Sequence, residues 1–189
     1  SPQETEPVVA RIAGLSEKAG RIVQRVNAIA RRREISLQRL DLVAVLRRLM
    51  PMGVHAEGPV WVLADELLLE HLSNNLLDNA QASAESGQAP AQVQVHVRAD
   101  ASSQQAVLCV SDSGAGVHEE DQAHVFDAFY STKEGGMGMG LAICRSIVEA
   151  HHGTIAVDQD PVLGGARFTV TLPLAPSPAN QPPPAEQNP

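Results

Sequence analysis

The chain has 189 residues, a formal net charge of −8, ordinary apolar content and few aromatic residues. This length allows one domain with its own core plus an accessory element, and Ala, Val, Leu and Ile must fill most of that core. The acidic balance argues against a nucleic-acid surface, which would need clustered Lys and Arg. No segment has the roughly 20 apolar residues that span a bilayer, and we expect no signal peptide.

The first segment, residues 7–33, carries a heptad pattern. Its apolar residues recur at alternating spacings of four and three, which is typical of a helical hairpin or a coiled coil; an ordinary amphipathic surface helix is the alternative. Because the apolar stripe is narrow, we expect this helix to need a partner helix. The stripe consists of Val8, Ile12, Leu15, Ala19, Ile22, Val26 and Ile29.

Shorter elements follow. A helix is predicted over residues 41–50, where Pro51 ends it, and a strand over residues 60–64. Asp65 is a suitable N-cap for the long leucine-rich helix that comes next, and Gly87 lies among the residues that break this helix.

The second half of the chain alternates strands with short helices. Residues 93–97 and 106–110 read as strands. A helical turn is predicted over residues 124–129, and a helix over residues 141–150 with Gly153 at its C′ position.

Two closing strands, residues 154–157 and 166–172, are expected to flank a hairpin that contains Gly164 and Gly165. From Pro173 onward the chain is rich in Pro, Ala, Asn and Gln, and we expect it to be disordered. Runs of helix followed by hairpin strands, without regular alternation of strand and helix, predict an α+β fold with helices on one face of a mixed sheet.

Two asparagines give the first chemical signal. Asn75 and Asn79 are four residues apart, so they share one helix face, while the leucines and alanine of the same helix face a core. Amide oxygens suit Mg²⁺, which proteins usually hold with one or two side chains plus substrate phosphates. The residues expected to face the core are Leu69, Leu72, Leu76 and Ala80.

The second signal is Asp112, which ends a strand and enters the glycine-rich turn that contains Gly114 and Gly116. Such a carboxylate can accept from an exocyclic amine such as that of adenine. The glycine run of residues 136–140 can then bring backbone amides over phosphates. The chain has no P-loop motif, and the glycine run does not leave a strand as a dinucleotide fingerprint must. Together the three segments predict a pocket for ATP and Mg²⁺.

These motifs, in this order, resemble the N, G1, F and G2 boxes of the catalytic, ATP-binding domain of sensor histidine kinases. That domain belongs to the superfamily of gyrase, the Hsp90 chaperones and mismatch-repair ATPases. The style is that of nitrogen- and dicarboxylate-sensing kinases, and the resemblance covers roughly residues 38–174. The boxes are NNLLDNA, Asp112 to Gly116, Phe126 to Lys133 and Gly136 to Leu141, with Gly164-Gly165-Ala166 as a closing turn.

The resemblance implies a two-layer, Bergerat-type ATP-binding fold with a mixed, mostly antiparallel sheet, preceded by a long helix. It assigns catalysis to Asn75, Asn79 and Lys133, with Asn79 as the Mg²⁺ ligand and Asp112 as the acceptor of the adenine amino group. Nucleotide binding is implied for Asn75, Asn79, Asp112, Gly114, Gly116, Phe126, Lys133, Gly136, Gly138, Met139, Gly140 and Leu141.

The implied domains are the second dimerisation helix with its linker in residues 1–37, the catalytic domain in residues 38–174, and a disordered tail in residues 175–189. The chain therefore resembles a fragment that begins inside the second helix of the dimerisation hairpin. No histidine has the sequence context of the family's phosphoacceptor. Five are expected to be ordinary surface or packing residues, and His151 and His152 would end a helix, where positive charge suits the dipole.

Two positions depart from the family pattern. Ala82 stands where many members carry Lys or Glu, which puts one phosphate or metal contact in doubt, and Asp127-Ala128 replaces the usual Glu-Pro. The cysteines, Cys109 and Cys144, lie in apolar contexts typical of reduced core thiols in the cytoplasm.

The function implied is transfer of the γ-phosphoryl of ATP to a histidine on a dimerisation helix, for relay to an Asp of a response regulator. The partners are that receiver domain, the phosphoacceptor helix of the same or a sister protomer and, in the intact protein, a second copy. A cytoplasmic domain is implied, which is compatible with an intact protein anchored in the bacterial inner membrane. Alternatives are an ATPase of the same superfamily, a degenerate ATP-binding docking module and an anti-sigma-factor kinase. The ATPase would need a glutamate where this chain has Asn75, since an amide is a poor general base.

Overall fold

A computed structural model describes residues 35–87, 90–131 and 138–176. Four parts of the prediction lie outside these ranges: the helix over residues 7–33, Lys133, Gly136 and the tail beyond residue 176. The domain boundaries stay predictions. In chain order the elements are β1 (Gln38–Asp41), α2 (Leu42–Leu49), β2 (Val54–His55), β3 (Trp61–Ala64), α3 (Glu66–Glu85), β4 (Val93–Asp100), β5 (Gln105–Asp112), α4 (Glu119–Gln122), α5 (Gly140–Ala150), β6 (Thr154–Gln159) and β7 (Ala166–Pro173).

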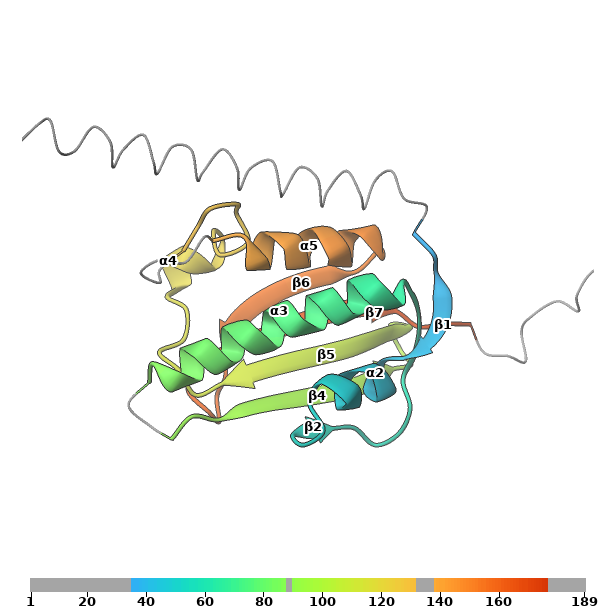
Figure 1. The fold of residues 1–189 in the computed structure, drawn as a ribbon, viewed down its shortest axis with the longest axis horizontal. Coiled ribbons are helices and arrows are strands. Elements are labelled where there is room, and N and C mark those ends of the chain that lie inside the picture. Colours follow the sequence, from blue (N-terminus) through green and yellow to red (C-terminus); the bar gives the residue numbers. More distant parts are fainter. Residues whose placement is uncertain (1–34, 88–89, 132–137, 177–189) are drawn as a thin grey trace, which may run out of the picture.

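The main sheet has five strands in the order β2-β4-β5-β7-β6 (Figure 1). Its pairs are antiparallel except for the parallel pair of β2 and β4. Helices α3 and α5 lie side by side over one face of this sheet, and β1 pairs with β3 in a separate antiparallel ribbon. The predicted α+β fold, a mostly antiparallel sheet covered by helices on one face, is confirmed.

Aspartate caps set where two helices begin. Asp65 precedes α3, and its Oδ1 accepts from the backbone N–H of Leu68 at 3.2 Å, as predicted for this N-cap. Asp41 precedes α2 and accepts with one oxygen from the N–H of Val43 and from that of Val60, at 3.0 and 3.1 Å. The second bond ties α2 to the segment that enters β3.

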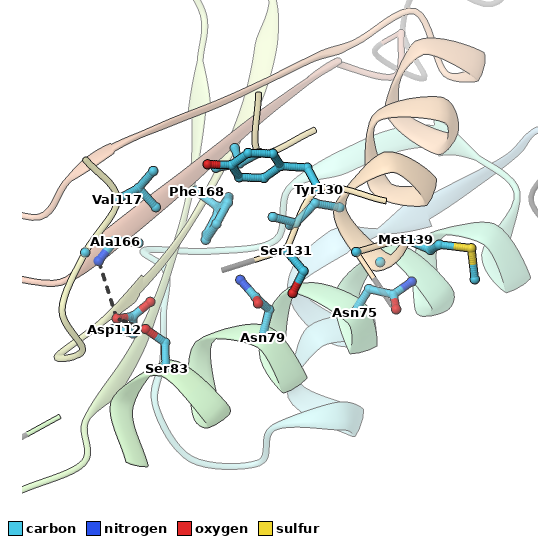
Figure 2. Close-up of a pocket in the computed structure, with 15 residues that line it drawn as sticks. Asn75, Asn79, Ser83, Asp112, Val117, Tyr130, Ser131, Met139, Ala166 and Phe168 are labelled. Atoms are coloured by element: carbon cyan, nitrogen blue, oxygen red, sulfur yellow. Dashed lines mark hydrogen bonds between the residues drawn. The ribbon is translucent and has the colours of Figure 1, made fainter. Parts of the chain in front are cut away.

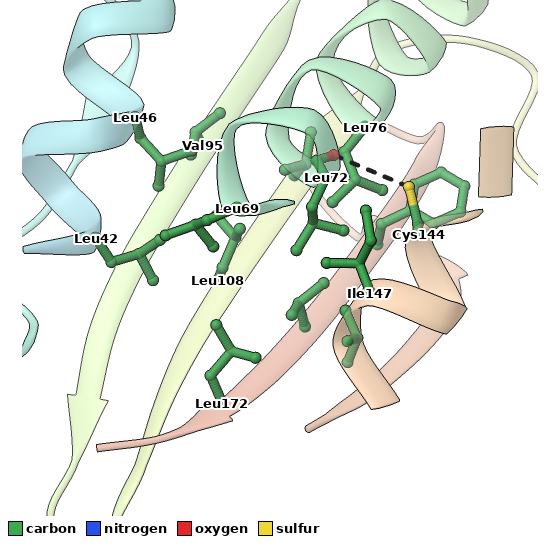
Figure 3. Close-up of a cluster of buried hydrophobic side chains, with 14 of the residues drawn as sticks. Leu42, Leu46, Leu69, Leu72, Leu76, Val95, Leu108, Cys144, Ile147 and Leu172 are labelled. Carbon is green, nitrogen blue, oxygen red and sulfur yellow. Dashed lines mark hydrogen bonds between the residues drawn. The ribbon is translucent and has the colours of Figure 1, made fainter. Parts of the chain in front are cut away.

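The core lies between α3, α5 and the sheet (Figure 3). The four residues of α3 predicted to face it are all at most 1% exposed: Leu69, Leu72, Leu76 and Ala80. On β7 the buried residues alternate, so this strand contributes one face to the core and leaves the other partly exposed. With one face of α3 committed to the core, the face that carries Asn75 and Asn79 is turned toward the start of α5.

Some predicted elements differ from the structure. The helical turn expected over residues 124–129 is a series of turns, and helix α4 lies earlier, at Glu119–Gln122. Three acidic residues at the start of α4 favour a helix there because they complement the helix dipole. Phe129 has a φ of +71°, which is incompatible with a right-handed helix. Strands β1 and β2 were not predicted, since each is short and depends on its partner strand.

The end of α5 also differs from the prediction. The left-handed C′ residue is His152, with a φ of +59°, and not Gly153. The N–H of Gly153 donates to Val148 O and that of His152 to Glu149 O, which together form a Schellman motif. Glycine is needed at 153 for a different reason, because a Cβ there would lie 2.1 Å from the carbonyl oxygen of Thr171.

His151 is not a positively charged helix end. It is 4% exposed, and its Nε2 accepts from the backbone N–H of Asp65 at 3.0 Å. Its Nδ1 lies 2.8 Å from the carbonyl oxygen of Ile147, which can only accept, so the proton is on Nδ1 and the ring is neutral. The expectation of positive charge is wrong for this residue, because both ring nitrogens are used in buried hydrogen bonds.

Both cysteines are free thiols, as expected, with Cys144 buried on α5 and Cys109 partly buried on β5. Burial raises the pKa of the Cys144 thiol to about 12. The other five histidines, at positions 55, 71, 96, 118 and 124, are exposed, which fits their interpretation as ordinary surface residues.

Candidate nucleotide site

A pocket of about 230 Å³ opens between α3, the end of β5, the start of α5 and the start of β7 (Figure 2). It unites segments that are far apart in the sequence. The predicted site residues that line it are Asn75, Asn79, Asp112, Gly116, Gly138, Met139, Gly140 and Leu141. The lining residues that the sequence analysis did not assign to nucleotide binding are Ser83, Val117, Val125, Tyr130, Ser131, Ala166 and Phe168.

Helix α3 supplies one wall through Asn75, Asn79 and Ser83, at spacings of four residues. All three project from the same side of the helix into the pocket, as Figure 2 shows. The Nδ2 atom of Asn75 is buried and has no hydrogen-bond partner among the described residues. A buried donor without a partner costs free energy, so a ligand acceptor at this point would relieve that cost.

Asp112 forms the floor at the end of β5 and is fully buried. Its Oδ1 accepts from three donors: the Ser83 hydroxyl at 3.0 Å, the N–H of Gly114 at 2.8 Å and the N–H of Ala166 at 3.3 Å. Its Oδ2 is buried and has no partner in the part of the chain that the structure describes. One carboxylate oxygen is therefore held in place by the protein, and the other is left to accept from a ligand.

Glycines allow the backbone to crowd around this carboxylate. A Cβ at Gly165 would lie 2.4 Å from Oδ1 of Asp112, and one at Gly114 would lie 2.2 Å from the hydroxyl of Ser83. Gly116 has a φ of +79°, a conformation that favours glycine. Gly114 thus supports the site by close packing and does not line the pocket.

The opposite end of the pocket is the N-terminus of α5. Gly140 and Leu141 line the pocket there, and Met139 at the N-cap makes no side-chain capping bond. The first backbone N–H groups of a helix lack internal partners and carry partial positive charge, which suits an anion. A Cβ at Gly140 would lie 3.6 Å from the Asn75 side-chain oxygen, an ordinary contact distance, so the start of α5 is adjacent to Asn75.

Gly138, which lies just before α5, is in close contact with Phe129. The N–H of Phe129 donates to the carbonyl oxygen of Gly138 at 2.9 Å. Gly138 has a φ of +62°, and a Cβ there would lie 2.5 Å from the carbonyl carbon of Phe129. Tyr130, which lines the pocket, donates its hydroxyl to Asp121 on α4, and this hydrogen bond raises the pKa of the tyrosine.

Besides Gly114, one further predicted residue in the described part of the chain, Phe126, does not line the pocket. Phe126 is buried and packs edge-on against Phe168, with ring centroids 6.3 Å apart, so it supports a lining residue from behind. Lys133 and Gly136 lie outside the described residues. Ala82, the departure in the N box, is exposed on α3 and does not belong to the pocket lining.

Some of the missed residues had a signal in the sequence. Ser83 continues the four-residue spacing of the two asparagines, so the same helix-face argument would have included it. Ala166 and Phe168 lie on the buried face of β7, but only the fold shows that this strand runs beside β5. No local pattern marks Val117 or Val125.

The two ends of the pocket differ in chemistry. An ionisable acceptor, Asp112, lies at one end, and amide donors from Asn75 and the start of α5 lie at the other. Such a pocket suits a ligand with a hydrogen-bond donor at one end and an anionic group at the other. In the part of the chain that the structure describes, no three His, Cys, Asp or Glu side chains converge to hold a metal. A cation here would have to rely on amide oxygens and on the ligand.

The arrangement agrees with a known family. Residues 64–176 match the family described as "Histidine kinase-, DNA gyrase B-, and HSP90-like ATPase". This chain belongs to that family of ATPases. The match extends from the end of β3 past β7 and so includes every residue that lines the pocket. Membership of this family supports ATP as the substrate of this domain.

Individual relatives of this ATPase domain are sensor kinases. The sensor histidine kinase TmoS of Ectopseudomonas mendocina is 31% identical over 91% of this chain and 19% of its own length. The C4-dicarboxylate transport sensor protein DctS of Rhodobacter capsulatus is 36% identical over 87% of this chain and 27% of its own length. The solved structure of full-length ShkA in complex with AMPPNP has a TM-score of 0.67 and 25% identity, and it covers 94% of this chain and 40% of ShkA.

The chain thus spans between about a fifth and just over a quarter of the length of the two curated relatives. Among the helices of the described residues, none is both long and apolar enough to cross a membrane.

Proposed function

We propose that this chain is the ATP-binding, catalytic portion of a sensor histidine kinase. It would bind Mg·ATP and pass the γ-phosphoryl to a histidine on a dimerisation helix, for relay to an Asp of a response regulator. The observation that carries the proposal is a pair of buried polar atoms at the two ends of one pocket, Oδ2 of Asp112 and Nδ2 of Asn75. Neither has a hydrogen-bond partner within residues 35–87, 90–131 and 138–176.

At the adenine end, Asp112 would accept the exocyclic amino group with Oδ2. Three donors already hold Oδ1, so the carboxylate cannot rotate without losing hydrogen bonds. Val117 and Phe168 would supply an apolar surface for the base, which would lie between these side chains and α3. An amine is required at this point because a carbonyl oxygen would face a carboxylate oxygen, and both are acceptors.

At the phosphate end, the N-terminus of α5 would receive the anion, and Asn75 would donate to a phosphate oxygen. The donor set fits Mg²⁺, which prefers oxygen ligands and commonly binds through few side chains plus phosphates. Asn79 would hold the cation through its amide oxygen. The cation would neutralise phosphate charge, and Lys133 would add a second positive charge there. Phosphoryl transfer depends mainly on such positioning and charge neutralisation.

Transfer is favoured over hydrolysis by the lack of a base. Among the described residues that line the pocket, Asp112 is the one carboxylate, and it lies at the end opposite to the start of α5. Asn75 occupies the position at which the ATPase members carry a glutamate, and an amide does not accept a proton usefully near neutral pH. Water bound beside the γ-phosphate would therefore lack a general base from these residues.

Partners follow from the same proposal: a receiver domain, the phosphoacceptor helix of the same or a sister protomer, and a second copy of the intact kinase. The relatives are named as sensors, and this supports a role in two-component signalling.

The proposal is tested by incubating the chain with excess Mg·ATP labelled at the γ position and following bound nucleotide and released phosphate for hours. Binding with almost no release is expected. Steady release of phosphate that is lost in Asn79→Ala would instead indicate an ATPase, and a lack of binding would contradict the nucleotide site itself.

A further inference from the structure

The hairpin between β6 and β7 contacts the end of β5 on both faces of the sheet. Ser111 and Asp112 are consecutive residues of β5, so their side chains project to opposite faces. On the pocket face, Asp112 accepts from the N–H of Ala166 at 3.3 Å. On the other face, the Ser111 hydroxyl lies near enough to the carboxylate of Asp160 to lower the pKa of that carboxyl. Asp160 and Ala166 are the two residues that flank the hairpin turn.

Asp160 organises this turn with four hydrogen bonds of its own. Its Oδ1 accepts from the N–H of Val162 at 2.9 Å and from that of Leu163 at 2.8 Å. Its backbone oxygen accepts from the N–H of Gly164 at 2.9 Å, and its N–H donates to Gly165 O at 2.8 Å. The carboxylate therefore closes the turn from inside through Val162 and Leu163, and the Asp160 backbone holds Gly164 and Gly165.

The position of Gly165 in turn limits that of the adenine acceptor. A Cβ at Gly165 would lie 2.3 Å from the backbone oxygen of Asp112 and 2.4 Å from its Oδ1. The turn is thus in direct contact with the carboxylate that would bind the base. A displaced turn would lose the Ala166 bond and leave the Asp112 carboxylate held by two donors in place of three, Ser83 and Gly114.

The charge state of Asp160 suits this role. The residue is 8% exposed. Burial by itself raises the pKa, but the N–H of Leu163, the Ser111 hydroxyl, the N–H of Val162 and the charge of Arg167 together outweigh it and lower the pKa. Asp160 is therefore an ionised acceptor at neutral pH, when its hydrogen bonds are strongest.

We infer that Asp160 is a positioning residue for adenine recognition: it holds the Gly164–Gly165 turn so that Asp112 presents Oδ2 to the base. Asp160 lies on the far face of β5 and is not one of the residues that line the pocket. The inference rests on the proposed role of Asp112, and it adds a residue to which the family motifs give no part.

The experiment compares ATP with inosine triphosphate, in which a carbonyl replaces the adenine amino group, by isothermal titration calorimetry on the full chain. The wild-type chain is expected to prefer ATP. In Asp160→Ala the affinity for ATP is expected to fall about tenfold, while that for inosine triphosphate changes less than about twofold. Asp160→Asn keeps an acceptor oxygen for Val162 and Leu163, so it should retain most of the preference.

Asp158→Ala is the matched control. Asp158 is a carboxylate of the same hairpin, but it is exposed and pairs only with Arg167, at 2.6 and 2.8 Å. This variant should keep the wild-type preference. Ser111→Ala removes the hydroxyl that stabilises the ionised Asp160 and is the second test if Asp160→Ala does not fold. Its preference for ATP should fall to a smaller extent.

Each outcome is decisive. Equal losses for both nucleotides in Asp160→Ala, with Asp160→Asn no better, would show a purely structural role and overturn the inference. An unchanged preference for ATP over inosine triphosphate in Asp160→Ala would also overturn the inference. If that variant does not fold, an unchanged preference in Ser111→Ala would do the same. A wild-type chain that binds both nucleotides equally would overturn the role of Asp112 first, and the inference with it.

Discussion

The backbone N–H of Asp65 donates to Nε2 of His151 over 3.0 Å, although the two residues are 86 positions apart. Asp65 also caps α3 and accepts from the backbone N–H of Ser36 at 3.2 Å, just before β1. The hydrogen bond between Asp65 and His151 joins the start of α3 to the end of α5, and both helices contribute residues to the pocket. The spacing of these helices is therefore held by a neutral, buried imidazole.

Replacing His151 with Ala should lower the free energy of unfolding by about 2 to 3 kcal/mol, since it leaves a buried N–H without a partner and creates a cavity. Urea denaturation followed by circular dichroism measures the change. His71→Ala, an exposed histidine on α3, is the control and should stay within about 0.5 kcal/mol of the wild type. A change of similar size in both variants would contradict the structural role of His151.

Replacing Asp112 with Asn should weaken ATP binding by about a hundredfold without unfolding the domain. The amide can keep an oxygen toward Ser83 and Gly114, but its NH₂ group then faces the adenine amine, and two donors repel. Calorimetry measures the affinity, and a thermal melt shows that the fold is intact. Asp78→Asn, an exposed carboxylate on α3, should bind ATP as the wild type does. Unchanged affinity in Asp112→Asn would exclude the adenine role.

Replacing Asn79 with Ala should remove the Mg²⁺ dependence of ATP binding. In the wild-type chain we expect tighter binding in MgCl₂ than in EDTA, because the cation bridges the amide oxygen and the phosphates. In the variant the ratio of the two dissociation constants should approach one. Asn74→Ala is the matched control, because Asn74 is an exposed amide on the same helix. A dependence that persists in Asn79→Ala would place the metal elsewhere.

Cys144 should resist thiol reagents in the folded chain. Burial raises its pKa to about 12, so almost no thiolate exists at pH 8, and the side chain is fully buried. Mass spectrometry after treatment with iodoacetamide at pH 8 should find modification at Cys109 before Cys144. Both residues should react in urea. Rapid modification of Cys144 under native conditions would mean that α5 opens readily.

Much of the site was visible in the sequence because each part depends on local spacing. The helix face of Asn75 and Asn79 follows from 3.6 residues per turn, and the position of Asp112 follows from a strand that ends in a glycine turn. The cap at Asp65 has the same origin, since a carboxylate before a leucine-rich segment bonds the first free N–H groups of its own helix.

Contacts between distant segments had no such signal. The register that places β7 beside β5 sets Ala166 against Asp112, and it decides that Ser111 meets Asp160. The proton position on His151 depends on a backbone N–H from another helix, and the need for Gly153 depends on the carbonyl of Thr171. Helix faces and turns depend on residues a few positions apart, so the chain specifies them locally. Hydrogen bonds and close packing between remote segments exist only once the core has brought those segments together.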